Sequence, residues 1–427
     1  MAGYVDSHYA RTEAEPGDYP PLGEALEVET CVIGGGLAGL ATAIDLAERG
    51  RSVVLLEQNR IGWGASGRNG GFASPGFPAG APALVEAVGM TDAQALYVEA
   101  IAAHALLRSR IATYGIDCGP VIDGQLRCGM ANSTESLQGY CDWMARHFGL
   151  QMQHRTPAEV RTVLDTTQYG DAFFNPYTFA VHPLNLSRGL ARAIVQHGGA
   201  VHENTPALSL SRNGARHVVR TPRGSVTAEN IVLACGGYID RLLPKLVSAT
   251  VPIATFVMVT EPLGERLRQA IAAPYAISDI KFATNYYRPL VDGRLLWGGR
   301  VQAWEPSPAR LARALHRDMA LFYPKLADAR VEIAWGGMMP YLKHKMPMVG
   351  PVEPGLWVAT GFGGLGVSLT TLAGRMIAGA IDEADDRFRM LARFGLPFAG
   401  GKWGKIPAQL IYWRHAAAAR FGRGRQV

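Results

Sequence analysis

The residues of this 427-residue sequence that most clearly indicate chemistry are three glycines near its N-terminus. Gly34, Gly36 and Gly39 form the pattern GxGxxG directly after an apolar run at 28–33, and a helical pattern of apolar residues follows them. A second apolar run ends at Glu57. In such a βαβ unit the glycines let a pyrophosphate approach the helix N-terminus, and the acid accepts hydrogen bonds from ribose hydroxyls. The pattern therefore predicts a dinucleotide site, for either NAD or FAD.

Three further glycine-rich stretches are spaced along the chain. They lie at 60–71, at 234–237 after a strand pattern, and at 361–366 between a strand pattern and a helix pattern. Glycine contributes 50 residues, whereas average usage would give roughly 30. Backbone without side chains can press against a planar ligand, and a second helix N-terminus would suit the electron-rich edge of a reduced flavin. We therefore expect these stretches to line one cofactor.

Composition and motifs exclude several classes of protein. Hydrophobic residues make up 48% of the chain, which is enough for a large core, and two to three domains are typical of this length. We find no apolar run of membrane-spanning length and no signal-peptide pattern, so we expect a cytoplasmic protein. Five cysteines without a CxxC pair favour free thiols, and without an HExxH motif we expect no metal site.

The basic residues are concentrated at the C-terminus. The net charge is +6, but every charged residue from Arg387 onward is Lys or Arg. No recognition motif accompanies this segment, so we expect no nucleic-acid partner. We expect the tail to pack on the fold with its charges in water, and contact with an anionic membrane surface is the alternative.

Over nearly its whole length the sequence resembles the FAD-dependent amine and amino-acid oxidoreductases, the family that includes D-amino acid oxidase, sarcosine oxidase and glycine oxidase. Within this family it is most similar to the gamma-glutamylputrescine oxidoreductases. The resemblance rests on CVIGGGLAGL, RIGWGASGRNGG, HPLNL, VLACGGY, YYRPLVDGRLLWGG, the glycine loop at 361–366 and LPFAGGKWGKIP.

The resemblance implies an α/β fold with a Rossmann-like FAD-binding domain and a discontinuous α+β substrate domain built on an antiparallel sheet. The segments assigned to the FAD-binding domain are 27–90, 152–245 and 335–388. The substrate domain would comprise 91–151 and 246–334, and the basic tail 389–427 would pack on the fold.

The resemblance also implies how the cofactor is bound. Met338, Met339 and Trp63 stand where some relatives carry the Cys or His that tethers the flavin, so non-covalent FAD is expected. The residues expected to contact FAD are Gly34, Gly36, Leu37, Ala38, Gly39, Glu57, Gln58, Gly64, Ala65, Ser66, Gly67, Arg68, Asn69, Gly70, Gly71, Ala207, Ala234, Cys235, Gly236, Gly361, Gly363, Gly364, Leu365, Gly366 and Val367.

The activity that the resemblance implies is oxidation of a C–N bond in an amine or amino acid. Hydride would pass to flavin N5, the imine would be hydrolysed to a carbonyl, and O2 would be reduced to H2O2. The alternatives are a dehydrogenase that passes electrons to a quinone or carrier, a non-catalytic flavin-binding partner subunit, and an NAD-only dehydrogenase. Gly363 and Leu365 replace a serine and a histidine of the putrescine-type loop, which predicts a less polar or differently charged substrate.

Five residues are candidates for the substrate pocket. Tyr286, Tyr287, Arg288 and Trp297 lie on predicted antiparallel strands, and His344 precedes the return to the FAD-binding domain. Aromatic rings would enclose an ammonium-bearing chain, and Arg288 would pair with a carboxylate. Aromatic residues on strands are also typical of cores, and arginines of surface ion pairs, so both interpretations are open.

Overall fold

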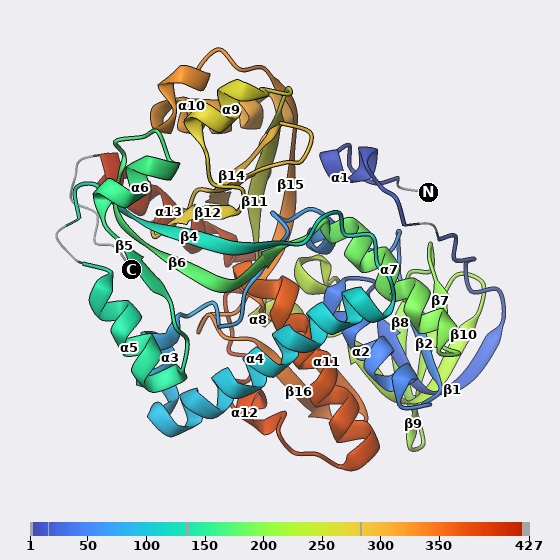
Figure 1. The fold of residues 1–427 in the computed structure, drawn as a ribbon. Coiled ribbons are helices and arrows are strands. Elements are labelled where there is room, and N and C mark those ends of the chain that lie inside the picture. The colour runs from blue at the N-terminus through green and yellow to red at the C-terminus, as the bar shows by residue number, and fades with distance from the viewer. Residues whose placement is uncertain (1–2, 16, 134–135, 282–283, 421–427) are drawn as a thin grey trace.

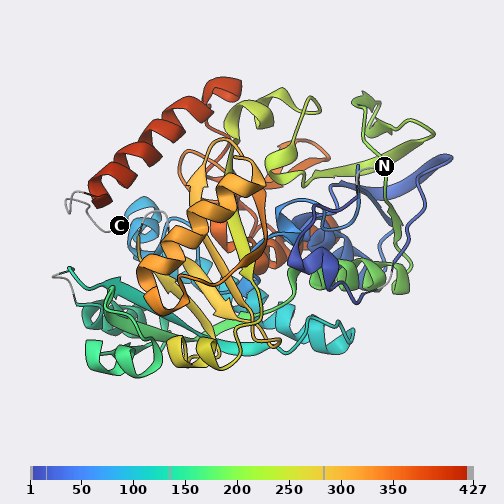
Figure 2. The same cartoon turned by 90° about the horizontal axis from the view of Figure 1, so that it is seen from above.

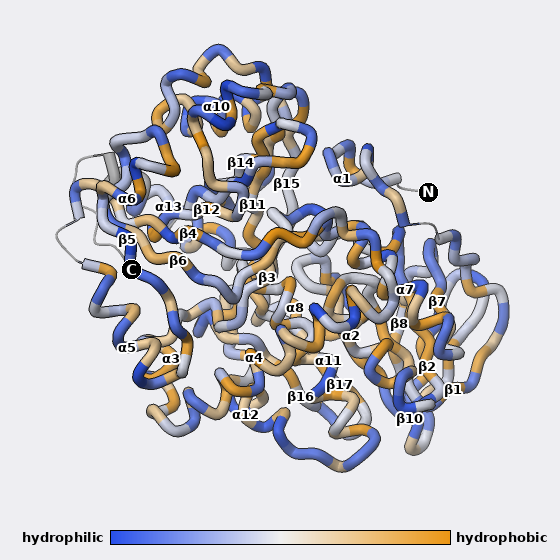
Figure 3. The backbone as a smooth tube through the Cα atoms, in the orientation of Figure 1, coloured by the Kyte–Doolittle hydropathy of each residue, from blue (hydrophilic) through white to orange (hydrophobic). Residues whose placement is uncertain are grey.

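The computed structural model describes residues 3–15, 17–133, 136–281 and 284–420. Two β-sheets lie side by side with helices around them, the first on the right and the second on the left in Figures 1 and 2. Apolar stretches gather along the strands and helices inside the molecule, whereas the outer loops are mostly hydrophilic (Figure 3). The cores therefore lie on the faces of the two sheets.

The first sheet has eight strands in the order β16-β17-β10-β1-β2-β7, extended by the hairpin β8–β9 beside β10. Strands β17, β10, β1, β2 and β7 are parallel, and β16 and β9 are antiparallel to their neighbours. Helices cover a parallel sheet, so its central strands are continuously apolar. The strands are β1 (Ala25–Ile33), β2 (Val53–Leu56), β7 (Ala200–His202), β8 (Ser209–Asn213), β9 (Arg216–Arg220), β10 (Ser225–Leu233), β16 (Met348–Glu353) and β17 (Leu356–Thr360).

The second sheet has nine strands in the order β15-β11-β14-β13-β12-β4-β6-β3, with β5 beside β6. All neighbours are antiparallel except β12 and β4. The strands are β3 (Phe72–Ala73), β4 (Ile122–Met130), β5 (Gln153–Arg155), β6 (Tyr169–Ala180), β11 (Val251–Thr260), β12 (Ala276–Asp279), β13 (Tyr286–Pro289), β14 (Leu295–Gln302) and β15 (Val331–Tyr341).

The helices complete the layers. Helix α2 packs against α7 and α11, α11 packs against α4, and α10 lies on β11, β14 and β15 of the second sheet (Figure 1). The helices are α1 (His8–Arg11), α2 (Leu37–Glu48), α3 (Ala81–Val88), α4 (Met90–Thr113), α5 (Gln138–Phe148), α6 (Pro157–Val163), α7 (Pro183–Gln196), α8 (Pro244–Ala249), α9 (Glu265–Ala270), α10 (Pro308–Phe322), α11 (Gly366–Glu383), α12 (Arg389–Ala392) and α13 (Lys405–Arg420).

The observed fold confirms the predicted α/β class. The sheets nevertheless divide the chain differently from the predicted domains, because β3 and most of β15, which fall within 27–90 and 335–388, belong to the second sheet. Strands β5 and β6 fall within 152–245, which we assigned to the FAD-binding domain, but they belong to the second sheet. Strand β6 pairs with β4, some 50 residues earlier in the chain, and β5 pairs with β6. Such long-range pairing leaves no local pattern in the sequence.

Helix α11 is long and apolar enough to cross a membrane, although we expected no segment of the sequence to be so. With the turn before it, Gly363–Glu383 is long and apolar enough to cross a membrane, with a hydropathy of 1.3, and it is the one such helix among the described residues. Of its most apolar window, 67% is buried inside the protein, where it contacts α2 and α4. A core helix passes the same test, so length and composition are weak evidence for a span.

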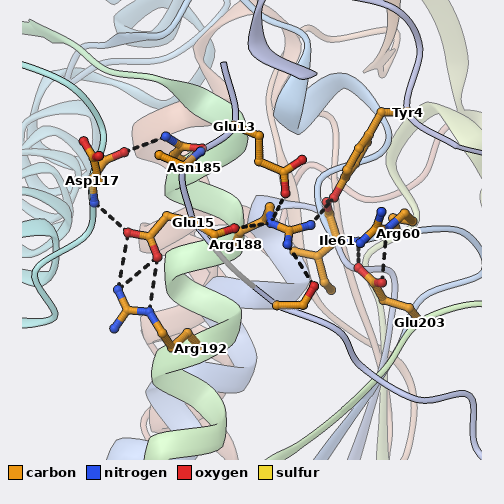
Figure 4. Close-up of polar contacts among 12 residues, drawn as sticks. Tyr4, Glu13, Glu15, Arg60, Ile61, Asp117, Asn185, Arg188, Arg192 and Glu203 are labelled. Carbon is orange, nitrogen blue, oxygen red and sulfur yellow. Dashed lines mark hydrogen bonds and ion pairs between the residues drawn. The ribbon is translucent and has the colours of Figure 1, made fainter. Parts of the chain in front are cut away.

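The N-terminal segment is anchored to helix α7 by Arg188 (Figure 4). This buried guanidinium pairs with Glu13 at 2.5 Å and donates a hydrogen bond to the hydroxyl of Tyr4 at 3.0 Å. Burial raises the pKa of Tyr4 to about 12, so its hydroxyl keeps its proton and donates to the carbonyl of Ile61 at 2.7 Å. The segment thereby holds the beginning of the glycine stretch at 60–71.

The contact between α2 and α11 depends on Gly374, and this yields a prediction. A Cβ at this position would lie 2.5 Å from the carbonyl carbon of Ala41, so Gly374→Ala would force the helices apart. Overpacking of this kind costs about 1–3 kcal/mol. We expect a lower Tm by differential scanning fluorimetry. The control is Gly139→Ala on exposed α5, where nothing lies within 4 Å and the Tm should hold or rise. Equal melting of both variants would contradict this account.

Candidate FAD and substrate site

A cavity of about 1790 Å³ extends between the two sheets. Its lining includes Ile33 and Leu56, the last residues of β1 and β2, and also Thr255 and Tyr286 of the second sheet. Ligands of open parallel sheets bind beyond the carboxyl ends of the strands, as here. Small-molecule sites usually have about 300–1,000 Å³. This cavity is therefore large enough for an extended cofactor together with a second molecule.

Most of the predicted cofactor residues meet in this cavity although they come from distant parts of the chain. The ones in its lining are Gly34, Gly36, Leu37, Ala38, Glu57, Gln58, Gly64, Ala65, Ser66, Asn69, Gly70, Ala207, Ala234, Cys235, Gly236, Gly363, Gly364, Leu365, Gly366 and Val367. The structure thus brings the glycine stretches together along one continuous wall.

The turn between β1 and α2 leaves backbone open to the cavity. Gly34 has φ +116°, and a Cβ there would lie 2.6 Å from the carbonyl oxygen of Ala234. The N–H of Leu37, at the start of α2, donates to the hydroxyl oxygen of Ser66 at 2.9 Å, which ties the second glycine stretch to the first. The N-terminus of α2 therefore faces the cavity with backbone donors and the positive end of its dipole.

Glu57 closes the nucleotide end of this wall. It is only 9% exposed, and its two carboxylate oxygens accept hydrogen bonds from the N–H groups of Gly35 and Asn59, each at 2.7 Å. Burial raises the pKa of the carboxyl. Each oxygen keeps a further acceptor position toward the cavity, as a ribose hydroxyl would need.

The N-terminus of α11 forms the opposite wall. A 3-10 turn at Gly363–Leu365 precedes this 18-residue helix, and Gly363 has φ +50°. A Cβ on Gly363 would lie 2.9 Å from the ring of Tyr341, so the glycine lets strand β15 approach the loop. A second set of helix N–H groups thus points at the same cavity as α2.

These features fit FAD. The cavity has two helix N-termini for anionic groups, a buried acid for a ribose and side-chain-free backbone over which a flat ring can lie. A Cβ on Gly36 would lie 2.9 Å from the hydroxyl of Ser66, within the space that a pyrophosphate would use.

Five predicted cofactor residues do not line the cavity: Gly39, Gly67, Arg68, Gly71 and Gly361. The glycines support the wall from behind, because side chains cannot fit there. A Cβ on Gly39 would lie 1.9 Å from the carbonyl oxygen of Gly34, and one on Gly71 would lie 2.1 Å from that of Val181. These glycines therefore support the shape of the site from behind its lining.

Arg68 is buried behind the glycine loop. Its guanidinium lies 4.3 Å from the ring of Trp63 and donates to the carbonyl of Gly336 at 3.4 Å. Burial lowers its pKa, and its Nε and Nη2 atoms have no partner among the described residues. Its backbone carbonyl accepts a hydrogen bond from the indole of Trp335, which joins the loop to β15.

Of the predicted substrate-pocket residues, only Tyr286 lines the cavity. Tyr287 and Trp297 are fully buried on the opposite face of the second sheet, where their rings stack at 4.4 Å. The hydroxyl of Tyr287 hydrogen-bonds to that of Tyr323 at 2.7 Å. Successive residues of a strand point to opposite faces, so neighbours 286 and 287 separate into cavity and core.

Arg288 and His344 also lie outside the cavity lining. Arg288 is buried and donates to the carbonyl of Val181 at 3.1 Å, so its guanidinium helps to hold the segment after β6. His344 accepts a hydrogen bond from the N–H of Met346 at 3.1 Å and contacts the ring of Phe394, and burial lowers its pKa. The structure gives both residues contacts that stabilise the fold.

The cavity also contains residues that sequence reasoning missed. Gln125 and Arg127 of β4, Phe173 of β6 and Ser278 of β12 line its second-sheet side. The sequence of β4 carried a usable signal, because polar Gln125 and Arg127 alternate with buried Leu126 and Cys128. Such alternation marks a strand with one polar face.

A family profile described as FAD dependent oxidoreductase matches residues 29–380. This chain belongs to that family. The match decides between the two dinucleotides that the glycine motif left open, in favour of FAD, and it confirms the family inferred from the sequence.

Relatives and solved structures agree with this assignment. Gamma-glutamylputrescine oxidoreductase of Escherichia coli (strain K12) is 31% identical over 410 residues, which are 95% of this chain and 96% of that protein. Glycine oxidase of Geobacillus kaustophilus (strain HTA426) is 27% identical over 88% of this chain and 98% of that protein. The crystal structure of glycine oxidase from Geobacillus kaustophilus has a TM-score of 0.69 at 22% identity, covering 87% of this chain and 99% of that one. The crystal structure of L-proline dehydrogenase from P. horikoshii has a TM-score of 0.70 at 19% identity, covering 87% of this chain and 98% of that one.

The position of Glu57 leads to a prediction for cofactor affinity. Glu57→Ala removes the acceptor for two backbone N–H groups and for a ribose, so we expect the Kd for FAD to rise by tenfold or more, because each unmade buried hydrogen bond costs about 1–3 kcal/mol. Titration of deflavinated protein with FAD, followed by flavin fluorescence, measures this. Glu86→Ala, which removes an exposed carboxylate on α3, should bind FAD as the parent does. Equal affinities would refute the role of Glu57.

Proposed function

We propose that this protein uses non-covalent FAD to oxidise the C–N bond of an amine or amino acid, with O2 as acceptor and H2O2 as product. The observation that carries the proposal is the continuity of one cavity from the glycine turn at Gly34 to Tyr286 on the second sheet. A cofactor at the first end and a substrate at the second would meet inside it. Support comes from similar proteins named gamma-glutamylputrescine oxidoreductase and glycine oxidase.

The residues around the place where cofactor and substrate would meet would act by holding the substrate in position. Bound FAD would supply the acceptor for hydride from the carbon next to the amine nitrogen. The ring of Tyr286 would lie 2.9 Å from a Cβ at Gly70, so it forms a wall directly beside the glycine loop. Burial raises the pKa of Tyr286. A neutral phenol can orient a substrate and exclude water, but it is a poor base for an amine.

Two observations support non-covalent binding. Met338, Met339 and Trp63, the residues found where some relatives tether the flavin, all line the cavity. The cysteine in the lining is Cys235, and burial raises its pKa to about 12, so its thiol stays protonated and is a poor nucleophile.

We also propose that the protein works in the cytoplasm. All five cysteines are free thiols, four of them buried, and free thiols are typical of a reducing compartment.

Anaerobic reduction of the holoenzyme tests the proposed function. Among polyamines, gamma-glutamyl amines, N-methyl amino acids and D-amino acids, at least one class should bleach the flavin absorbance at roughly 450 nm, and admission of air should restore it with release of H2O2. If no compound in the panel bleaches the flavin, the enzymatic proposal is wrong and a non-catalytic flavin-binding subunit is favoured. If the flavin is bleached but is reoxidised only slowly in air, the proposal that O2 is the acceptor is wrong and a dehydrogenase is favoured.

Adjacent tyrosines provide a matched pair of variants. Tyr286→Phe removes a hydroxyl that lies at the cavity and makes only long hydrogen bonds, of 3.3 Å, to Thr255 and to the carbonyl of Phe256, so we expect a several-fold change in the rate of flavin reduction by substrate and a smaller loss of Tm than in Tyr287→Phe. Tyr287→Phe breaks a buried hydrogen bond to Tyr323, which is worth about 1 kcal/mol, so we expect a lower Tm and an unchanged rate. Stopped-flow reduction and thermal melting measure the two effects, and the reverse pattern would contradict the assignment of the two faces.

Helix α13 favours a second candidate, a dehydrogenase that delivers electrons to a carrier at a membrane. This helix lies along the outside of the molecule (the red helix in Figure 2). Trp403, Ile406, Leu410 and Trp413 recur at helical spacing and are 44% to 73% exposed, with Lys405 and Arg414 beside them. Exposed aromatic and aliphatic side chains next to basic ones are typical of helices that lie in the headgroup region of anionic bilayers.

Vesicle flotation tests this second candidate. We expect the holoenzyme to float with vesicles rich in phosphatidylglycerol, less so with phosphatidylcholine, and the double variant Trp403→Ser/Trp413→Ser to remain in solution. The same double variant should keep its rate of flavin reduction by substrate. Absence of flotation by the parent protein at low salt would rule out this role for α13.

A further inference from the structure

Arg127 is a cation in the cavity for which the protein supplies no counterion. Its guanidinium lies 5.7 Å from the centre of the Phe173 ring, and among the described residues it forms no ion pair. Two buried arginines are paired, Arg110 with Asp45 at 3.0 Å and Arg188 with Glu13 at 2.5 Å, whereas Arg127 is only partly buried. Because Arg127 lines the cavity, an anion bound there would supply the charge partner that the described residues do not.

The register of the second sheet places Arg127 relative to the glycine loop. Tyr286 on β13 pairs with Ser278 on β12, which pairs with Arg127 on β4, which pairs with Phe173 on β6. All four residues line the cavity, so they form one row across the same face of the sheet. Neighbouring strands lie about 4.8 Å apart. The backbone of Arg127 is therefore about 10 Å from that of Tyr286.

The guanidinium of Arg127 lies 5.7 Å from the ring centre of Phe173, its partner on β6, the strand on the side of β4 away from Tyr286. Because the backbones of Arg127 and Tyr286 are two strand spacings apart, we expect an anion bound at Arg127 to lie well away from the wall beside Gly70. An α-carboxylate lies one carbon from its nitrogen and cannot span this distance while its amine is oxidised at that wall. A group bound by Arg127 would therefore belong to the distant end of a longer molecule.

The charges around Arg127 also favour an anion. The acidic side chains in the described lining are Glu57, at the nucleotide end, and Asp240, which lies 3.9 Å from Arg241. The second-sheet end contributes Lys281 as a further cation, with Asp279 4.0 Å away. Cavities lined by one sign of charge concentrate ligands of the opposite sign.

The wall beside Arg127 is apolar and aromatic. Tyr140, Met144 and Met152 line the cavity together with Phe173, and this surface suits a chain of methylene groups. Tyr97 and Tyr140 lie close enough to Arg127 for its charge to lower their pKa values, which are raised overall by burial, so both hydroxyls stay available as donors. An anion at Arg127 would thus have further hydrogen-bond donors within reach.

We propose that Arg127 binds a carboxylate at the far end of the substrate, so that the enzyme prefers amines carrying an acidic group about 10 Å from the reacting nitrogen. This inference rests on the proposed function, because it assumes that an amine is oxidised beside Tyr286. It narrows the substrate class from amines in general to long ω-amino carboxylates and amides of similar length that end in a carboxylate.

The test compares ω-amino carboxylates of increasing length with diamines of equal length, using anaerobic reduction of the holoenzyme. We expect tighter apparent binding for the longer carboxylates than for the diamines. Arg127→Met should weaken carboxylate binding on the order of 10- to 100-fold and should not weaken diamine binding, because it removes a cation that repels the distal ammonium group. Arg127→Lys should keep part of the preference, and Arg127→Glu should reverse it. Arg212→Met, at an exposed position on β8, should behave as the parent does.

A probe that cannot be oxidised separates this inference from the proposed function. Hexanoate, which has a carboxylate and an apolar chain but no amine, should bind the holoenzyme by titration calorimetry and fail to bind Arg127→Met. If no amine bleaches the flavin while hexanoate binding depends on Arg127, the carboxylate subsite stands and the proposed function falls. If amines are oxidised, but neither the carboxylate preference nor hexanoate binding changes in Arg127→Met, the inference is overturned and the proposed function stands.

Discussion

Helix α2 is pressed against strand β1 and helix α11 with backbone, not side chains, at the contacts. Side chains at Gly39 or Gly374 would overlap the carbonyl of Gly34 or of Ala41. This close packing sets the distance between the helices that begin at the cavity, so the N–H groups of both point at the same space. Binding of a pyrophosphate between them is therefore a consequence of how tightly the first sheet and its helices pack.

The cavity joins two surfaces with different chemistry. At the first sheet it offers backbone donors and a buried acid, which suit a nucleotide. At the second sheet it offers a row from Tyr286 to Phe173 that contains a single guanidinium. The antiparallel sheet is well suited to this second role, because one of its faces can be cavity while the other is packed as core.

The parts of this fold that follow local patterns could be predicted from sequence. The run at 28–33 and the helix after it correspond to β1 (Ala25–Ile33) and α2 (Leu37–Glu48), and most of the predicted cofactor residues line the cavity. The positions of Tyr287 and Trp297 in the core could not be predicted in this way. Alternation along a strand separates two faces but does not say which is covered by helices and which by ligand. Arg127 was missed for a related reason, since its place in the same row as Tyr286 depends on the pairing of β4 with β12, about 150 residues later in the chain.

The wall of the cofactor site is assembled from segments near both ends of the chain. Strand β1 and helix α2 precede residue 50, whereas β17 and α11 come after residue 355 and close the opposite side. During synthesis on the ribosome the first half of the site is therefore made long before its partner leaves the exit tunnel. The cavity for FAD can be completed only after translation of nearly the whole chain, and until then the face of α2 that packs against α11 is uncovered, whereas its contact with α7 can already form.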